Sequence, residues 1–579
     1  MAKIVASLCL VFFPFFNDLK ADELVSKEMP SDALVFFETK GISEFLIKVR
    51  DSTFFQSLLE SGDFDELKSS DFIKEVSSTF DFLELFLRKD IWVLNERLLS
   101  GRMGVAAYEA EDPEDPEDPE DPNVVILIKP KEASAWLKNR IRFAPLIRLG
   151  IKRIGRTDFE KSVYAYRTRG DKNEATYFAL NDEWIIVTSS RRLLKDTVSL
   201  QGTKVDGAKK VDPISKDIKY SSMIGKMGTE HQATVFLNTR KISKIDGRFG
   251  IPEKIEDPML SLFLGGVVNQ LEDSSYAGLV IDFDGEKLNF SVDMEKEREA
   301  EPSVSTKGIE ILLPPKIPGY LGGISVYQPF SKWHRERNDL FQSKIIPGSE
   351  LLKGKLSNLL FGASKDLEAG YIGDGLVFLS ALADDAGKDE NGISLPGFCF
   401  LVDLNKLEGA ESSMHVFFEE MLSELNVSKS DVEIEWTKQV ETHEEIRLLV
   451  ARSKKSPEKN YPTPNCFQIG SRYCFSSSLD LSFSLIKKIQ ETESLRVSNK
   501  GLNFNLDFNQ LTKFFSLNKK EYLSELSRAR GDEQSGQRDF NNINSFLSTL
   551  QSLSGTYESN QGRLGFDLEA IFNKTSIDE

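Results

Sequence analysis

The chain has 579 residues and a net charge of −18, with 91 acidic against 73 basic side chains. One hydrophobic core rarely serves more than about 300 residues, so at least two domains are expected. The acidity argues against a nucleic-acid-binding surface, because affinity for phosphates rests on many lysine and arginine contacts.

The N-terminus has the organisation of a secretory signal peptide. Lys3 precedes an apolar run from Ile4 to Phe16, and Ala21 suits the position before a cleavage site. The run is shorter than the roughly 20 apolar residues that a membrane-spanning helix needs. We therefore expect residues 1–21 to be removed, no transmembrane span in the mature chain, and an exported protein of the periplasm or the extracellular space.

Pro30-Ser31-Asp32-Ala33 lies near the start of the expected mature chain, directly before an apolar, strand-like run. This Pro-x-Asp-Ala motif and the segment after it, up to about residue 130, resemble a group of large exported bacterial proteins. Those proteins carry only a domain-of-unknown-function label. The resemblance implies an exported bacterial origin and brings no activity, cofactor or site residue with it.

An acidic loop, residues 109–123, separates two apolar runs and contains four Glu-Asp-Pro triplets. Its acids are Glu111, Asp112, Glu114, Asp115, Glu117, Asp118, Glu120 and Asp121. Proline at every third position disfavours a helix and adjacent carboxylates repel, so we expect an extended, solvated spacer. Calcium binding is the alternative, but a tight site wraps about six to eight oxygens around the ion, and the tract lacks a turn-forming glycine.

A basic segment without any acid follows, from Trp136 to Arg156. Its cations include Lys138, Arg140, Arg142, Arg148, Lys152, Arg153 and Arg156. A helix beginning at Lys131 would run back towards the acidic loop, and each exposed charge pair between them would contribute about 0–1 kcal/mol. A solvated helix face and a contact with anionic lipid or an acidic envelope partner stay open as alternatives.

Several stretches of the first half recur in the second half, always in the same order. "FFQS" recurs as "LFQS", "MGVAAYE" with "NVVILIK" as "LVFLSAL" with "GFCFLVD", "TVFLNTRKISK" as "NFNLDFNQLTK", and "LNFSVDME" as "LGFDLEAI". "YFALNDEWIIVTSS" matches "CFQIGSRYCFSSSL", with Trp184 against Tyr473. Repeats in a fixed order indicate an internal duplication. We predict two copies of one domain, residues 29–296 and 314–572, joined by a charged linker over 297–313.

Within each copy, short apolar runs are bounded by turn residues such as Asn181-Asp182 and Asp284-Gly285, which are typical of hairpins. Segments with helical spacing lie between them, for example 64–87 and 131–142. The expected fold class is therefore α+β, each copy a largely antiparallel sheet with helices packed on one face. The 41 phenylalanines suit the cores of such layers.

Three cysteines remain in the expected mature chain, and two of them lie in "NCFQIGSRYCFSS". A hairpin with a three-residue loop places Cys466 opposite Cys474, where they could form a disulfide, whereas a two-residue loop places them on opposite faces. Buried thiols that act as small apolar side chains are the alternative.

Patterns of known catalytic chemistry are missing from the sequence. It has no Walker phosphate loop, no Gly-x-Ser-x-Gly elbow and no His-Glu-x-x-His. The histidines, His231, His334, His415 and His443, are scattered, and His415 with Glu419 lacks a second pair of zinc ligands. We therefore expect no enzymatic activity, no cofactor and no metal site.

These observations favour a non-enzymatic exported protein that acts as a binding or scaffold module through two related domains. No motif names its partner, although an envelope protein or a lipid fits the expected location. Two alternatives stay open. One is a carrier of a hydrophobic ligand or lipid in a Phe-lined cavity, and the other is a hydrolase without a recognisable motif.

Overall fold

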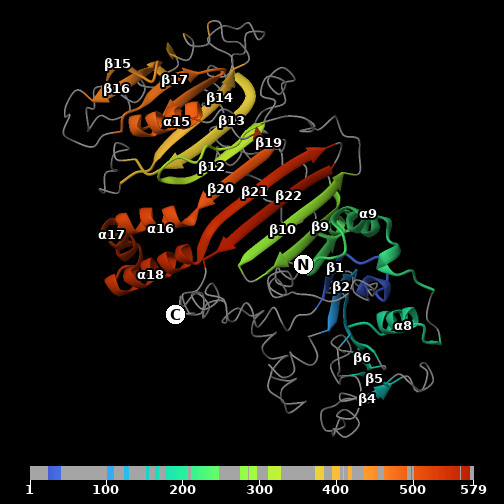
Figure 1. Ribbon diagram of the computed structural model, residues 1–579. Coiled ribbons are helices and arrows are strands. Elements are labelled where there is room, and N and C mark those ends of the chain that lie inside the picture. Colours follow the sequence, from blue (N-terminus) through green and yellow to red (C-terminus); the bar gives the residue numbers. More distant parts are fainter. Residues whose placement is uncertain are drawn as a thin grey trace. The chain divides into compact units, whose positions relative to one another are not determined.

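The computed structural model describes residues 24–40, 101–109, 123–129, 152–154, 164–167, 177–180, 183–206, 210–246, 274–284, 286–296, 311–327, 372–383, 394–404, 436–453, 462–491, 497–498, 501–560 and 563–573, with single positions between 409 and 419. These residues fall into two compact units, with the boundary after Arg298. Figure 1 colours the chain from blue at the N-terminus to red at the C-terminus.

The first unit is built on an antiparallel sheet. Its described strands are β1 (Val35–Thr39), β2 (Arg102–Tyr108), β3 (Asn123–Lys129), β4 (Lys152–Ile154), β5 (Tyr164–Arg167), β6 (Tyr177–Leu180), β7 (Ile185–Thr188), β8 (Ala233–Leu237), β9 (Ser274–Phe283) and β10 (Lys287–Lys296). They pair in the spatial order β4-β5-β6-β7-β3-β2-β1-β8-β9-β10. The strand nearest the N-terminus is therefore in the interior of the sheet.

Helices cover part of the first sheet. They are the 3-10 turns η1 (Val25–Lys27) and η4 (Ile214–Lys216) and the helices α8 (Arg191–Leu200), α9 (Ile218–Met227) and α10 (Thr239–Asp246). Helix α8 packs on β6 and β7, α9 on β9 and β10, and α10 on β9. The core beneath them contains Phe36, Tyr220, Phe236 and Tyr276, all at most 2 % exposed.

The second unit is also antiparallel. Its described strands are β11 (Ile311–Leu312), β12 (Tyr320–Tyr327), β13 (Ile372–Ala381), β14 (Gly397–Leu404), β15 (Trp436–His443), β16 (Ile446–Ser453), β17 (Asn465–Ile469), β18 (Arg472–Ser476), β19 (Val497–Ser498), β20 (Leu502–Asp507), β21 (Leu550–Asn560) and β22 (Arg563–Phe572). The large sheet has the order β15-β16-β17-β18-β14-β13-β12-β20-β21-β22, and β11 pairs with β19 separately. Strand β11 lies within the segment expected as a linker.

Four helices belong to the described part of the second unit: α15 (Leu479–Glu491), α16 (Phe508–Leu517), α17 (Lys519–Arg530) and α18 (Glu533–Thr549). Helix α15 packs on β14, β17 and β18, and α16 packs on β12 and β21. Helices α16, α17 and α18 contact one another (Figure 1). The expected α+β class with antiparallel sheets is thus what the structure shows.

The two large sheets have the same order of pairings. Strand β1 pairs with β2 and β8, as β12 pairs with β13 and β20, and β3 pairs with β2 and β7, as β14 pairs with β13 and β18. The ladders place Val125 and Cys399 at equivalent positions, as the match of "NVVILIK" with "GFCFLVD" predicts. One match is shifted, because the ladder puts Ile185 and not Trp184 in the place of Tyr473.

Helix starts coincide as well. Helix α8 follows the N-cap Ser190 and α15 follows Ser478, and each serine oxygen accepts a hydrogen bond from the N–H three residues later. Helices α10 and α16 begin after Asn238 and Asp507, which accept from the N–H three residues on in the same way. The units differ in their helical insertions: α9 lies between α8 and β8, whereas α17 and α18 lie between α16 and β21.

Other expectations fall partly or wholly outside the described residues. The helices at 64–87 and 131–142, the "FFQS" repeat and residues 1–23 lie there, so they stay predictions. Within the described residues, none of the helices combines the length and the apolar character needed to cross a membrane.

Candidate functional site

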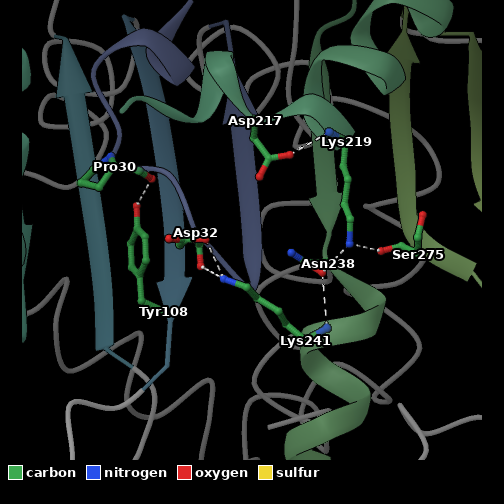
Figure 2. Close-up of polar contacts among 8 residues, drawn as sticks. All are labelled: Pro30, Asp32, Tyr108, Asp217, Lys219, Asn238, Lys241 and Ser275. Atoms are coloured by element: carbon green, nitrogen blue, oxygen red, sulfur yellow. Dashed lines mark hydrogen bonds and ion pairs between the residues drawn. The ribbon is translucent and has the colours of Figure 1, made fainter. Parts of the chain in front are cut away.

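The Pro-Ser-Asp-Ala motif lies where β1 meets the start of α10 (Figure 2). The carbonyl oxygen of Pro30 accepts a 2.9 Å hydrogen bond from the hydroxyl of Tyr108 on β2. Lys241 of α10 donates from Nζ to Oδ1 of Asp32 at 2.9 Å and to its carbonyl oxygen at 3.2 Å. The motif therefore ties the first strand to both a neighbouring strand and a helix.

Asp32 has a left-handed backbone, with φ at +72°. Few residues other than glycine, asparagine and aspartate adopt this region readily. Gly319 lies three residues before Gly322, where the ladder of β12 with β20 begins, as Asp32 lies three residues before Val35, and the φ of Gly319 is +70°. A Cβ on Gly319 would be only 2.9 Å from the carbonyl oxygen of Leu382. Both units thus need an unusual turn here, which explains the motif as a structural joint.

Asn238 connects Lys241 to a second set of polar contacts, and these residues together form a polar cluster (Figure 2). Oδ1 of Asn238 accepts from Nζ of Lys219 at 3.4 Å and from the backbone N–H of Lys241 at 3.3 Å. Lys219 also donates to the carbonyl oxygen of Ser275 at 3.2 Å, while Asp217 caps α9 by accepting from the Lys219 N–H at 2.8 Å. These contacts cross-link α9, α10 and β9, so the cluster joins elements and presents no recognisable reacting group.

A carboxylate is buried at the centre of the first sheet. Glu38 of β1 accepts from the N–H of Val25 at 2.6 Å and from the hydroxyl of Tyr220 at 3.3 Å. Burial raises the pKa of Glu38, although these hydrogen bonds and the charge of Arg102 act against the rise. Perturbed acids occur at active sites and in structural networks alike. Here both carboxylate oxygens bond elements of the fold, which favours the structural role.

His231 links the end of α9 to β9. Its Nδ1 lies 2.6 Å from Oδ2 of Asp282, and its Nε2 lies 2.6 Å from the carbonyl oxygen of Met227. A carbonyl can only accept, so with an ionised Asp282 both ring nitrogens donate and the ring is an imidazolium. The hydrogen bond to Asp282 raises the pKa of His231. With both N–H groups committed, His231 is unsuited to act as a general base.

Replacing His231 with glutamine is expected to lower stability at low pH by about 0.3–2 kcal/mol, the span from an exposed to a partly buried cation at a helix C-terminus. The folded pKa of His231 lies above its unfolded value. Its contribution is therefore complete below about pH 6.5, the ordinary histidine pKa, and is lost as the pH rises through the folded pKa. Urea unfolding of both proteins at pH 5.5 and 9 measures the difference. Two results would contradict a stabilising imidazolium at His231. One is a stability difference between the two proteins that is larger at pH 9 than at pH 5.5, and the other is the same difference for His443→Gln.

One face of the second sheet carries aromatic side chains from five of its strands. This aromatic face consists of Phe378, Phe398, Phe400, Tyr473, Phe475, Phe504 and Tyr557. The ring centroids of Phe378 and Phe400 are 4.9 Å apart, and those of Phe398 and Phe400 are 6.1 Å apart. Phe398 is 45 % exposed. Helix α15 covers the opposite face, where Leu481, Leu485 and Ile486 are buried.

The first sheet has no aromatic residue at the equivalent positions. In the same order, its ladder positions hold Val105, Val124, Ile126, Ile185, Val187, Val235 and Ile281. A valine or isoleucine therefore suffices for the architecture at all seven places. At these seven positions only the second unit has aromatic rings, which makes this face the candidate functional site.

Of the two alternatives for the hairpin cysteines, the disulfide between Cys466 and Cys474 is wrong. Strands β17 and β18 are joined by the two-residue turn Gly470-Ser471, and the ladder sets Cys466 opposite Phe475 and Cys474 opposite Phe467. The two cysteines therefore point to opposite faces of the sheet. All three cysteines are buried and none of the three forms a disulfide in this structure, which is the alternative interpretation of the sequence.

The acidic loop, residues 109–123, joins the paired strands β2 and β3, and the connection between β13 and β14 takes the same place in the second unit. Tyr108 of β2 lies opposite Asn123 of β3, and Ala381 of β13 lies opposite Gly397 of β14. The acids from Glu111 to Asp121 lie outside the described residues, so their role as a spacer stays a prediction.

The basic segment is not one continuous helix. Lys152 and Arg153 lie on strand β4, which pairs with β5, so they cannot share a helix face with the cations before them. The remaining cations of the segment lie outside the described residues. Contact of the segment with anionic lipid or an acidic partner therefore stays a prediction.

The described histidines and acids form no cluster for a metal. Within the part of the chain that the structure describes, no group of three or more His, Cys, Asp or Glu side chains is arranged to hold an ion. Glu419, which the sequence places one helical turn after His415, forms an ion pair with Lys438 of β15. The ring of His415 lies beside Tyr473 of the aromatic face, with centroids 6.3 Å apart.

Comparisons with known proteins give little further guidance. No family model and no curated protein matches the chain. Among solved structures, crystal form I of TP0453 is similar at 9 % identity over 48 % of this chain and 80 % of that one, with a TM-score of 0.23. Crystal form III matches at 7 % identity over 49 % and 85 %, with a TM-score of 0.24. Scores of this size carry neither fold nor function across.

Proposed function

We propose that this chain is an exported, non-enzymatic binding protein made of two copies of one domain, residues 29–296 and 314–572. In this proposal residues 1–21 are a signal peptide, and the second copy holds the binding surface. That surface is the aromatic face, and it takes an apolar ligand.

The duplication is supported by the order of the strands and by the positions of the helix caps. Ten strands pair in the same order in each unit. Matched segments found in the sequence, such as those of β2, β3, β8 and β10, fall on equivalent strands. Two unrelated domains would have no reason to share caps at Ser190 and Ser478.

The binding role rests on one observation, the replacement of seven aliphatic positions by aromatic ones on a single face. A core needs apolar volume, and the first unit supplies it there with valine and isoleucine. Rings that remain partly exposed, above all Phe398, offer apolar area that a ligand can remove from water. The same observation favours a carrier of a hydrophobic ligand over a scaffold, because a scaffold has no need for aromatic residues on one face.

The test is binding of N-phenyl-1-naphthylamine, a neutral apolar fluorophore, to the mature chain. Phe398→Ser removes the most exposed ring and is expected to weaken binding about tenfold or more, since a buried phenylalanine contributes about 1.5–3 kcal/mol. Leu517→Ser is the matched control, because Leu517 is 65 % exposed at the end of α16 and lies outside the aromatic face. Unchanged affinity in Phe398→Ser, or an equal loss in the control, would refute this site.

A further inference from the structure

Two cysteines meet inside the second unit. Cys399 is on β14 and Cys474 is on the neighbouring strand β18, and their Sγ atoms are 3.1 Å apart. Both side chains are fully buried, in a core cluster that also contains Leu379, Leu401 and Leu485. We propose that this pair is a redox site, at which the exported protein acquires a disulfide between Cys399 and Cys474.

The strand register makes the pair diagonal neighbours on one face. Cys474 lies opposite Leu401, and Cys399 lies opposite Ser476. Diagonal partners are generally farther apart than direct ones, yet here the two sulfur atoms are already in contact. A disulfide has an S–S distance of about 2.05 Å, so its formation requires the sulfurs to approach by only about 1 Å.

The first unit shows that packing alone does not require sulfur at these positions. Its ladder places Val125 where the second unit has Cys399, and Ile186 where it has Cys474. Both residues are buried, at 0 % and 1 % exposure. An aliphatic pair therefore fills the same place, and the second unit has two thiols there that contact each other.

The third cysteine is kept apart from this pair. Cys466 lies on β17 with its side chain on the other face, where its Sγ accepts a 3.1 Å hydrogen bond from the hydroxyl of Tyr473. Pairing of β17 with β18 thus separates Cys466 from Cys474. The sheet itself selects which two of the three thiols combine.

The oxidation is an ordinary thiol–disulfide exchange, with a small disulfide such as oxidised glutathione as the oxidant. The Cys474 thiolate attacks one sulfur of the oxidant, forms a mixed disulfide and releases one thiolate. The Cys399 thiolate then attacks the Cys474 sulfur, closes the bond and releases the second thiolate. The two protons lost by the cysteines are taken up by the two thiolates, so the oxidant is reduced to two thiols.

The folded state favours the thiol form of Cys474. Burial raises the pKa of Cys474 well above its ordinary value, and the neighbouring Cys399 raises it further. Since the thiolate is the nucleophile, exchange is slow in the closed sheet. The bond therefore forms while β14 and β18 are still separating and pairing, which for an exported protein is after translocation into an oxidising compartment.

The experiment refolds the mature full-length chain with and without oxidised glutathione and counts thiols by alkylation under denaturing conditions. The expected result is one alkylated cysteine, Cys466, and a linked pair of peptides that contain Cys399 and Cys474. The bond encloses a separation of 75 residues. The unfolding equilibrium constant of the oxidised protein should therefore be at least about tenfold lower than that of the reduced protein.

Matched variants separate the bond from packing effects. Cys399→Val and Cys474→Ile introduce the first unit's residues and should abolish both the link and the difference between oxidised and reduced protein. Cys466→Ala should keep both. Three alkylated thiols after oxidative refolding, or a link that involves Cys466, would overturn the proposal, and neither result bears on ligand binding at the aromatic face.

Discussion

Replacing Phe236 with alanine is expected to lower the free energy of unfolding of the first unit by about 3–5 kcal/mol, the usual cost of removing a buried phenylalanine. Phe236 of β8 is 2 % exposed. Its ring lies between Tyr220 of α9 and Tyr276 of β9, at centroid distances of 5.7 and 6.2 Å. Phe36, opposite Phe236 on β1, joins the same cluster. Losing one ring therefore removes contacts from both layers.

Urea unfolding and hydrogen exchange in β8 and β1 measure this loss. Asn505→Ala is the matched control, since the ladder places Asn505 of β20 where the first unit has Phe236, and Asn505 is only partly buried. The control is expected to change stability by no more than about 0.5 kcal/mol. Similar losses for both variants would mean that the two sheets do not differ in this part of their cores.

Leucine at Gly555 is expected to destabilise the second unit by about 1–3 kcal/mol through overpacking. Gly555 of β21 lies opposite Phe504 of β20, and a Cβ on Gly555 would be 2.3 Å from the Phe504 ring. The first unit has Leu279 and Val235 at the same two ladder positions. Each unit thus combines a large and a small side chain here, in opposite arrangements.

The double variant Phe504→Val/Gly555→Leu gives the second unit the pair found in the first. It is expected to be more stable than the sum of the two single changes predicts, with a coupling of about 0.5–3 kcal/mol. A double-mutant cycle by urea unfolding measures the coupling. Strictly additive losses would show that the two positions are not equivalent in the two units, and would remove one support of the duplication.

The sequence predicted strands well, because a hairpin has turn residues between two apolar runs that are close together in the chain. The hairpin expected at Asp284-Gly285 joins β9 and β10, where Oδ1 of Asp284 accepts from the N–H groups of Glu286 and Lys287. The match of Trp184 with Tyr473 was wrong by one residue, since it paired one aromatic ring with another. The register is set by the pairing of β7 with β3 and of β18 with β14. Comparing the two local sequences does not show this pairing.

The choice between the two alternatives for the hairpin cysteines could not be made from the sequence for a related reason. Loop length decides which face a hairpin residue occupies, and "GSR" permits a loop of two or three residues. Gly470 adopts φ at +58°, a conformation that suits the first position of a two-residue turn. The contact between Cys399 and Cys474 joins residues 75 positions apart, so it needed the whole strand order.

The candidate site was only partly accessible from the sequence. Phenylalanines at alternate positions indicate a sheet face, but they do not say that one unit concentrates them. Aligning the two copies strand by strand would have revealed it, because Val124 and Ile126 stand where Phe398 and Phe400 occur. The bridge from His231 to Asp282 spans 51 residues and has no local signature.

Tyr108 at the end of β2 pairs with Asn123 at the start of β3, so the loop between them can change in length without changing the β2–β3 register. Each Glu-Asp-Pro triplet corresponds to nine nucleotides, so the gain or loss of a whole triplet keeps the reading frame. One additional triplet would raise the cost of loop closure by only about 0.2 kcal/mol. Strains should therefore differ in triplet number while their β2–β3 ladders stay identical, which would make this stretch a neutral length marker for the lineage.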